Sequence, residues 1–274
     1  MINVSKGLDL PISGSPAIKI SDEPKISSVA VLSNDFVGMK PTMFVKVNDK
    51  VKVGQKIFED KKNPGVYFTS PAGGTVKSIN RGAKRRFLSI EIDIDANEEY
   101  ELFNLGTTTN EIKTALVDSG LWNGFRTRPF NRTPKVDDNA DAVFINCCDT
   151  NPLSVDPYEI IMEDKSSFDE GIKILSNLFD CEIHLTYQNN GFDTSNKDIN
   201  YHHVSGPHPA GLSSTHISKI YPVSLKRIVW TINYQDIISI GYLFKNNKIR
   251  THKIIALGGP NVFEPSLIKV RPSA

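Results

Sequence analysis

The residues best suited to chemistry gather in one loop, Gly206-Pro207-His208-Pro209-Ala210-Gly211-Leu212. Proline fixes φ and removes a donor, whereas glycine permits positive φ, so the run predicts a loop of specified shape. Rigid loops that carry a histidine often hold functional residues. The open question is whether this loop binds, catalyses or docks.

The histidines do not form a recognisable metal or catalytic pattern. The set considered is His202, His203, His208, His216 and His252. Metal ligands usually lie at close helical or hairpin spacing with cysteine or carboxylate support, and this spacing is nonspecific. No G-x-S-x-G elbow and no Ser-His-Asp signature appears. The pattern favours satisfied structural histidines, and we assign no catalytic residue and no metal ligand.

The cysteines are Cys147, Cys148 and Cys181, without a C-x-x-C pair. A structural zinc site or an iron–sulfur cluster needs about four suitable ligands, so the thiols alone cannot build one. Neighbouring residues on a strand point to opposite faces, which separates the first two side chains. We expect buried or partly buried free thiols.

A nucleotide fingerprint is missing where it would be needed. A Rossmann site places G-x-G-x-x-G between a strand and a helix. After the predicted strand that ends at Asn146, the chain continues with Cys147-Cys148-Asp149-Thr150-Asn151-Pro152, which contains no glycine. Asp149 would also repel phosphate. The sequence favours a Rossmann-like layer without nucleotide, and a soluble NAD(P)-dependent oxidoreductase stays as an alternative.

The first hundred residues are typical of short β-strands. β-branched and aromatic segments alternate with turn clusters, which predicts a small barrel or sandwich. The expected strands are 29–32, 43–47, 56–58, 66–68, 75–79 and 87–92. Residues 47–61 and 70–76 resemble the biotinyl/lipoyl domain pattern. A carrier modified at Lys61 or Lys62 is therefore a second alternative, although Pro64 would reshape the hairpin that carriers need.

From Thr108 onward the pattern predicts alternating strands and helices. Thr108 with Glu111, and Ser167 with Glu170, form candidate capping boxes. Strands are expected at 141–146, 181–187 and 254–257, and a helix at 236–244. The fold class is α/β and multi-domain, a biotinyl/lipoyl-like β barrel-sandwich followed by a Rossmann-like α/β domain. We expect domains at 1–104, 105–258 and 259–274, the last being the start of a truncated SLBB-type domain.

Charge and hydropathy narrow the class of protein. Lys and Arg number 32 and Asp and Glu 31, a net charge of +1, which argues against a broad nucleic-acid surface. The local cluster Arg81-Gly82-Ala83-Lys84-Arg85-Arg86 could contact phosphate or anionic lipid, although a solvated turn is the commoner case. No run reaches the ~18 apolar residues of a membrane helix. The N-terminus lacks the features of a signal peptide, so we expect a cytoplasmic chain.

Peculiar segments throughout the chain resemble one family. They are 6–12, 36–43, 58–66, 79–85, 119–122, 126–130, 149–153, 206–212 and 232–236. In this order they are similar to NqrA, which is one of the subunits of the sodium-translocating NADH:quinone reductase. That family in turn looks like the RnfC component of the Rnf complex and the flavin-binding subunit of respiratory complex I, without their flavin and iron–sulfur ligands.

The resemblance implies a peripheral subunit on the cytoplasmic face of the bacterial inner membrane. Its partners would be the other subunits of a complex that oxidises NADH, reduces ubiquinone and pumps sodium, and the chain would bind no redox cofactor. A quinone needs aromatic or thioether walls and a His or Tyr donor. On that chemistry the candidates for quinone contact are Phe36, Met39, Phe130, His208 and Tyr234.

Overall fold

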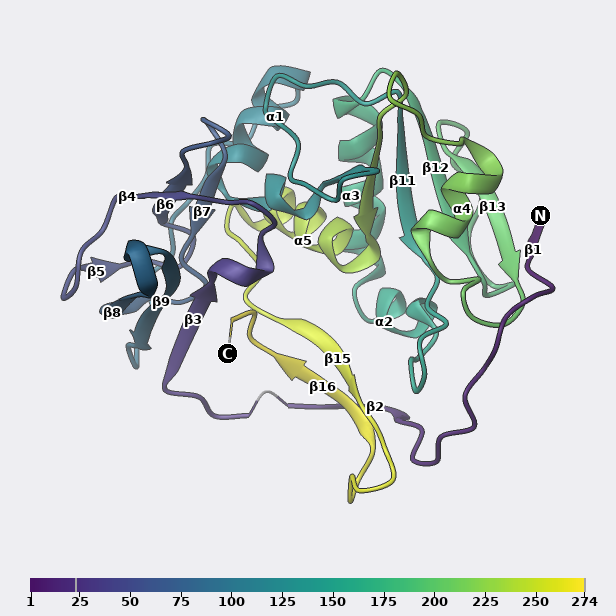
Figure 1. The fold of residues 1–274 in the computed structure, drawn as a ribbon, viewed down its shortest axis with the longest axis horizontal. Coiled ribbons are helices and arrows are strands. Elements are labelled where there is room, and N and C mark those ends of the chain that lie inside the picture. Colours follow the sequence, from purple (N-terminus) through teal and green to yellow (C-terminus); the bar gives the residue numbers. More distant parts are fainter. Residues whose placement is uncertain (23, 274) are drawn as a thin grey trace.

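The computed structural model describes residues 1–22 and 24–273. A β domain and an α/β domain lie side by side, and a small sheet of arm and C-terminal strands lies below them in the view of Figure 1. Both domains share one apolar core, because buried side chains of the sandwich and of the α/β domain belong to a single contact cluster.

The β domain consists of two antiparallel sheets packed face to face. One has the order β3 (Ser28–Leu32), β9 (Phe87–Ile94), β8 (Gly74–Arg81) and β5 (Lys50–Val51). The other has the order β4 (Pro41–Met43), β6 (Lys56–Asp60) and β7 (Tyr67–Thr69). Phe58 and Phe68 stack between the sheets with ring centroids 4.6 Å apart. The predicted β barrel-sandwich is therefore confirmed.

One strand is shorter than its sequence pattern indicates. The pattern predicts an extended segment over residues 43–47, but β4 ends at Met43. A turn follows, in which the Lys46 amide donates to Asp49 Oδ2 at 2.9 Å and Asn48 adopts a φ of 73°. Phe44 is 49% exposed as a result. The local hydrogen bond of the aspartate overrides the β-propensity of the neighbouring side chains.

The α/β domain is built on a mainly parallel sheet. Its order is β1 (Ile2–Asn3), β13 (Asn200–Ser205), β12 (Glu182–Tyr187), β11 (Ala142–Cys147), β14 (Val229–Asn233) and β10 (Arg126–Arg128), and β10 alone of these described strands pairs antiparallel. The strand order reverses between β11 and β14, as in doubly wound folds. The predicted Rossmann-like domain is confirmed.

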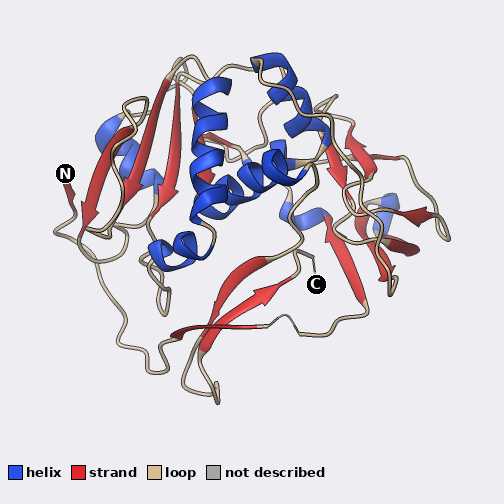
Figure 2. Cartoon of the chain, turned by 180° about the vertical axis from the view of Figure 1, so that it is seen from behind, coloured by secondary structure: helices blue, strands red, loops and turns tan. Residues whose placement is uncertain are grey.

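Helices cover both faces of this sheet. Val143 and Ile145 of β11 face the core with α3 (Lys165–Leu178) and α5 (Tyr234–Asn246), and α1 (Thr109–Asp118) and η3 (Leu121–Gly124) lie on the same side. Ala142 and Phe144 face Ile217 of α4 (Ser213–Ile220). Figure 2 shows the helices of the larger layer between the parallel sheet and the β domain. α2 (Pro157–Glu163) follows β11 at the edge.

One predicted capping box is present and the other is wrong. Thr108 and Glu111 exchange the reciprocal bonds at the start of α1. At α3 the helix begins earlier, because the side chain of Asp164 accepts from the Ser167 amide at 3.2 Å and acts as N-cap. Ser167 lies inside the helix and is buried. Aspartate and serine are comparable caps, so sequence alone does not separate the two starts.

The N-terminal arm contributes to two sheets away from the β domain. β1 pairs parallel with β13, and β2 (Ala17–Ser21) pairs parallel with β16 (Ser266–Val270). β16 also pairs antiparallel with β15 (Lys253–Leu257), so residues 259–273 are tied to the chain that precedes them. The division into 1–104, 105–258 and 259–274 stays a prediction. Within the described part of the chain, none of the helices combines the length and apolar character needed to traverse a bilayer.

Two glycines allow α3 and α5 to pack closely. A Cβ on Gly241 would lie 1.7 Å from the carbonyl oxygen of Ser167, and one on Gly171 would lie 2.2 Å from that of Ile237. Both contacts are to helix backbone, which cannot move aside as a side chain can. The helix pair therefore requires glycine at these positions.

We expect Gly241→Ala to lower the free energy of unfolding by about 3 kcal/mol, because the helices must separate to admit a methyl group. Urea denaturation followed by circular dichroism measures the change. Gly82→Ala is the matched control, since its Cβ would make only a 3.4 Å contact with Leu88. The control should stay within about 0.5 kcal/mol of the parent. Equal effects of the two variants would contradict the packing argument.

Candidate functional site

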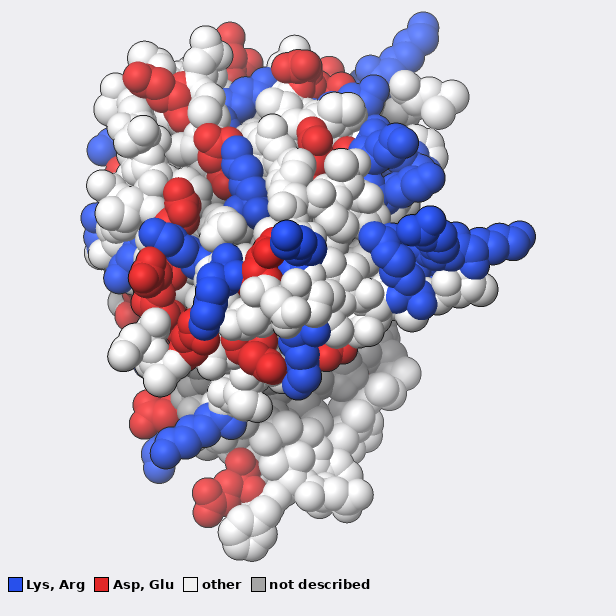
Figure 3. Space-filling view, turned by 90° about the vertical axis from the view of Figure 1, so that its left-hand side faces the viewer, with Lys and Arg blue, Asp and Glu red and all other residues white. Residues whose placement is uncertain are grey.

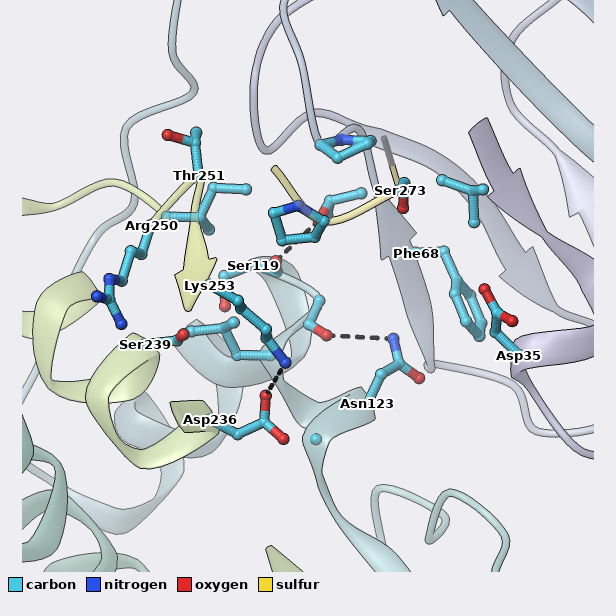
Figure 4. A pocket seen from close by; sticks show the side chains of 18 of the residues that line it. Asp35, Phe68, Ser119, Asn123, Asp236, Ser239, Arg250, Thr251, Lys253 and Ser273 are labelled. Carbon is cyan, nitrogen blue, oxygen red and sulfur yellow. Dashed lines mark hydrogen bonds and ion pairs between the residues drawn. The ribbon is translucent and has the colours of Figure 1, made fainter. Parts of the chain in front are cut away.

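Two adjoining hollows lie at the seam between the β domain and the α/β domain. The first has a volume of about 430 Å³ and is lined by β7, η3, the start of α5 and the segment 249–253 (Figure 4). The second has a volume of about 250 Å³ and lies between the loop 36–39 and the segment 127–138. Phe36 and Phe68 line both hollows, and their rings meet edge to face at 4.5 Å.

The first hollow holds a neutralised charge pair. Lys253 Nζ lies 2.7 Å from Asp236 Oδ1, and the side-chain amide of Asn233 donates to the other oxygen at 2.5 Å. Asn233 also caps α5, because its Oδ1 accepts from the amides of Gln235 and Asp236. The pair is thus fixed by the helix start. Figure 4 shows Asp236 and Lys253 pointing toward each other below Ser119.

Two arginines border the first hollow. Arg126 donates to the carbonyls of Asn123 and Phe125, and its guanidinium carbon lies 5.9 Å from the Phe36 ring centroid. Burial lowers the pKa of Arg126, and Asp236 opposes this shift. Arg250 is only 9% exposed, and Figure 4 shows its guanidinium turned away from the charge pair. Arg250 therefore belongs to the wall of the hollow.

The second hollow combines apolar and basic side chains. The loop 36–39 supplies Phe36 and Met39, and the opposite wall supplies Arg132 and Lys135. The arginine is placed by a turn in which the Thr127 amide donates to the Arg132 carbonyl at 2.7 Å. The wall is then anchored by Trp122, whose Nε1 donates to the Pro134 carbonyl at 3.0 Å. An apolar ring could rest on the loop while a cation faces its polar edge.

The structure brings part of the predicted quinone set together. Phe36 and Met39 line the second hollow. Phe130 lies in the 127–132 turn that forms the opposite wall, and its side chain is 65% exposed. His208 and Tyr234 lie elsewhere, at the carboxyl edge of the parallel sheet after β13 and β14. One hollow therefore cannot be formed from all five candidates.

His208 joins three segments of the chain. Its Nδ1 lies 3.1 Å from the carbonyl oxygen and 3.2 Å from the Oγ1 of Thr150, and its backbone amide donates to Asp9 Oδ1 at 3.0 Å. The Leu8 amide donates to the His208 carbonyl at 3.0 Å. The rigid loop thus holds the N-terminal arm and the segment after β11. It borders an open groove of about 560 Å³ with Leu8 and Leu10.

Tyr234 lies where the strand order reverses. It is the first residue of α5, and burial raises the pKa of its hydroxyl to about 12. Its ring packs against the cluster of Ile160, Ile254 and Leu267. Gln235 binds Ile254 through both its side-chain groups, at 2.8 Å each. The small sheet of β2, β15 and β16 therefore packs over the crevice in which doubly wound folds usually bind ligands.

Sequence reasoning missed the charged members of the seam. Arg126, Arg132, Asp236 and Lys253 come from four separate segments, and their types are common on surfaces. The available signal was the unusual run Arg126-Thr127-Arg128-Pro129-Phe130, which is one of the segments that carry the family resemblance. Proximity across the seam is a tertiary property that spacing along the chain does not contain.

The candidate carrier lysines, Lys61 and Lys62, lie on the turn that follows β6. Both are exposed. The Lys61 amide donates to the Lys40 carbonyl at 2.8 Å, and the Lys62 amide donates to Asp60 Oδ1 at 3.0 Å. Lys62 also lines the second hollow. Carrier function at either position stays an untested alternative.

The thiols are free and poorly suited to reaction. Burial raises the pKa of Cys148 to about 12 and that of Cys181 to about 11, and raises that of Cys147 further. A thiolate is the reactive form, so these thiols are protonated at neutral pH. Among the described residues, no group of three or more His, Cys, Asp or Glu side chains is arranged to hold a metal ion.

Several histidines are structural. His216 is buried, with Nδ1 3.0 Å from Thr186 Oγ1 and Nε2 2.6 Å from the Ala210 carbonyl. His184 Nδ1 lies 3.1 Å from His202 Nε2. Burial is the main cause that lowers the pKa of all three. In His252, burial and the neighbouring Arg250 lower the pKa to about 4.

These shifts predict acid sensitivity well above the carboxylate range. A histidine with a lowered pKa is neutral when folded, whereas the unfolded chain binds a proton below about pH 6.5. The stability that these histidines contribute is therefore fully present above about pH 6.5 and falls as the pH approaches 4. We expect His252→Gln to recover about 1–2 kcal/mol of the loss between about pH 7.5 and pH 5, allowing for partial solvent screening.

Urea unfolding at both pH values measures this effect. Thr251→Ser is the control, because it changes the same segment without removing a titratable group. A stability that is flat between these two pH values, or an identical loss in His252→Gln and the control, would contradict the prediction.

Comparison with family models divides the chain in the same way as the structure does. Residues 2–95 match the NqrA N-terminal barrel-sandwich hybrid domain, and residues 107–249 match the NqrA second alpha/beta domain. The second match alone spans more than half of the chain. The order of the two domains agrees with the fold class expected from sequence.

Curated proteins give the same result, and all three compared here are NqrA, the "A" component of a Na(+)-translocating NADH-quinone reductase. The protein of Vibrio atlanticus is 43% identical over 281 residues, covering 100% of this chain and 63% of that protein. The protein of Neisseria meningitidis serogroup B is 46% identical over 280 residues, covering 98% and 62%. The Klebsiella pneumoniae protein is 44% identical over 277 residues, covering 98% and 62%.

The chain thus spans about 62% of the length of these relatives. Its two domains match the two family models in the same order along the chain. With this agreement over nearly all of its residues, the chain belongs to the NqrA family.

Proposed function

We propose that this chain acts as the NqrA component of a membrane complex that oxidises NADH, reduces ubiquinone and pumps sodium ions. The observation that carries the proposal is the match of both domains, in order, to NqrA. The chain would bind as a peripheral subunit at the cytoplasmic face of the membrane. Its contribution would be docking to the other subunits and forming part of the quinone site.

We infer further that the chain carries no redox cofactor of its own. The segment after β11 offers no glycine loop for phosphate, and Asp149 and Asp156 bring negative charge there. Asp156 already caps α2 by accepting from the Tyr158 amide at 3.0 Å. The crevice at the sheet reversal is covered by the cluster around Ile254 and Leu267. Each feature disfavours a dinucleotide or flavin in the position usual for this fold.

Membership of the complex is tested by isolation from the native membrane. After mild solubilisation, an affinity tag on the chain should retain integral membrane subunits and a flavin-containing NADH oxidase. The separated chain should show no flavin or iron–sulfur absorbance. A chain that retains no partner and carries a lipoyl or biotinyl mass on Lys61 or Lys62 would support the carrier alternative. Saturable NADH binding by the free chain would support the oxidoreductase alternative.

The second hollow is the best candidate for the quinone contact of this chain. Phe36 presents its ring and Met39 a polarisable thioether, which suit a planar ring. Arg132 on the opposite wall could donate hydrogen bonds to a quinone carbonyl and favour the negative charge that develops on reduction. This role is a proposal for Phe36, Met39 and the wall that includes Phe130. His208 and Tyr234 would act in docking and packing.

We expect Met39→Ala combined with Arg132→Gln to weaken binding of a quinone analogue to the intact complex about tenfold or more. The reason is the loss of a contact to the ring and of a charged donor. His208→Ala is the control, because it removes a histidine of the predicted quinone set that lies outside the hollow. An inhibitor titration of quinone reductase activity reads out affinity. Unchanged affinity in the double variant, or an equal loss in His208→Ala, would remove this hollow from consideration.

A further inference from the structure

A basic turn protrudes from the β domain between β8 and β9. It contains Arg81, Lys84, Arg85 and Arg86, all of which are exposed, and Lys84 and Arg85 lie in the short helix η2 (Ala83–Arg85). Figure 3 shows lysine and arginine side chains gathered at one edge of this face, where few acidic side chains lie between them. None of the four basic residues lines either hollow of the seam.

The cations of this turn differ from the other lysines of the domain. Lys50, Lys52 and Lys77 form ion pairs with Asp95, Glu99 and Asp93 at 2.6, 3.1 and 3.2 Å. Among the described residues, by contrast, no carboxylate lies within ion-pair distance of the four basic side chains of the turn. The positive charge of the turn is therefore not neutralised by these residues, although the chain as a whole is almost neutral.

The backbone of the turn is maintained at a conformational cost. The Arg86 amide donates to the Ala83 carbonyl at 3.2 Å, and the two residues between them, Lys84 and Arg85, have φ values of 55° and 58°. A tight turn with positive φ at both central positions usually has asparagine and glycine there. Long basic side chains at these positions are less stable than that pair. The sequence thus keeps charge where stability alone favours other residues.

The turn is rooted in the core and carries an apolar neighbour. Phe87 and Ile90 of β9 are buried in the sandwich, which fixes the direction of the hairpin. Leu88 lies between them in sequence, is 38% exposed and sits beside Gly82. A rigid tip thus presents unpaired cations next to an exposed aliphatic side chain. This combination suits an interface between charged headgroups and apolar chains.

We propose that this turn binds anionic phospholipid headgroups at the membrane surface, an inference that rests on the proposed membrane-associated function. Four clustered cations are enough for a weak, salt-sensitive contact with an anionic surface. They are too few for stable binding to nucleic acid when the net charge is only +1. The contact would orient a subunit whose main attachment is to its partners.

Flotation of the purified chain with protein-free vesicles tests the proposal. Vesicles of phosphatidylcholine with about 30% phosphatidylglycerol should bind the chain at low salt, and pure phosphatidylcholine vesicles should not. The triple variant Lys84→Gln, Arg85→Gln, Arg86→Gln should lower the partition coefficient on the order of 100-fold, given the usual contribution of each basic side chain near such a surface. Addition of about 0.5 M salt should release the parent chain.

Two further variants separate this contact from charge in general and from folding. The triple variant Lys50→Gln, Lys52→Gln, Lys77→Gln removes equal charge from the same domain and should retain most of the binding. Lys84→Asn with Arg85→Gly should raise the melting temperature, since it suits the turn, while weakening vesicle binding. Equal loss in both triple variants, or equal binding to both vesicle types, would overturn the proposal. Because the vesicles contain no protein, a failure here is distinguishable from a failure to isolate the complex, which tests the proposed function separately.

Discussion

The burial of Trp122 joins the two domains of this protein. Its ring packs edge to face on Phe125 and Trp230, with centroids 5.3 and 5.6 Å away, and almost none of its surface is exposed. The next residue, Asn123, donates to the Tyr67 carbonyl of the β domain at 2.7 Å. The short helix η3 is therefore fixed on both sides. Because the two hollows flank it, their shape depends on this one anchored turn.

The same packing explains why the seam can contain charges. Thr69 Oγ1 donates to the Ser119 carbonyl at 3.0 Å, and Gly120 adopts a φ of 76° that lets the chain turn there without a side chain. A Cβ at Gly120 would meet Thr69 Oγ1 at 2.8 Å. Satisfied backbone groups line the seam, so the ion pair of Asp236 and Lys253 adds polarity without leaving an uncompensated charge. A rigid and locally neutral seam is better suited to a neutral ring than to a multiply charged nucleotide.

The sequence predicted those elements whose signals are local. α1 and α5 show helical spacing and caps, and the β domain shows short strands between turns, so both appear where expected. β1 could not be predicted, because two residues show no periodicity and the strand exists only by pairing with β13. Phe36 and Met39 followed from side-chain chemistry. Arg132 did not, because an arginine in a polar turn acquires its position from the anchored chain around Trp122.

The histidine loop shows how rigidity and reactivity can be confused in a sequence. Prolines and glycines around His208 predicted a fixed shape, and the structure uses that shape to bind Thr150 and Asp9. A general base needs an unoccupied lone pair facing a substrate, whereas Nδ1 of this histidine is engaged with the Thr150 segment. No metal-ligating cluster accompanies it among the described residues. The loop therefore contributes to function by holding the arm across the edge of the parallel sheet, where Leu8 and Leu10 are exposed, rather than by chemistry at the ring.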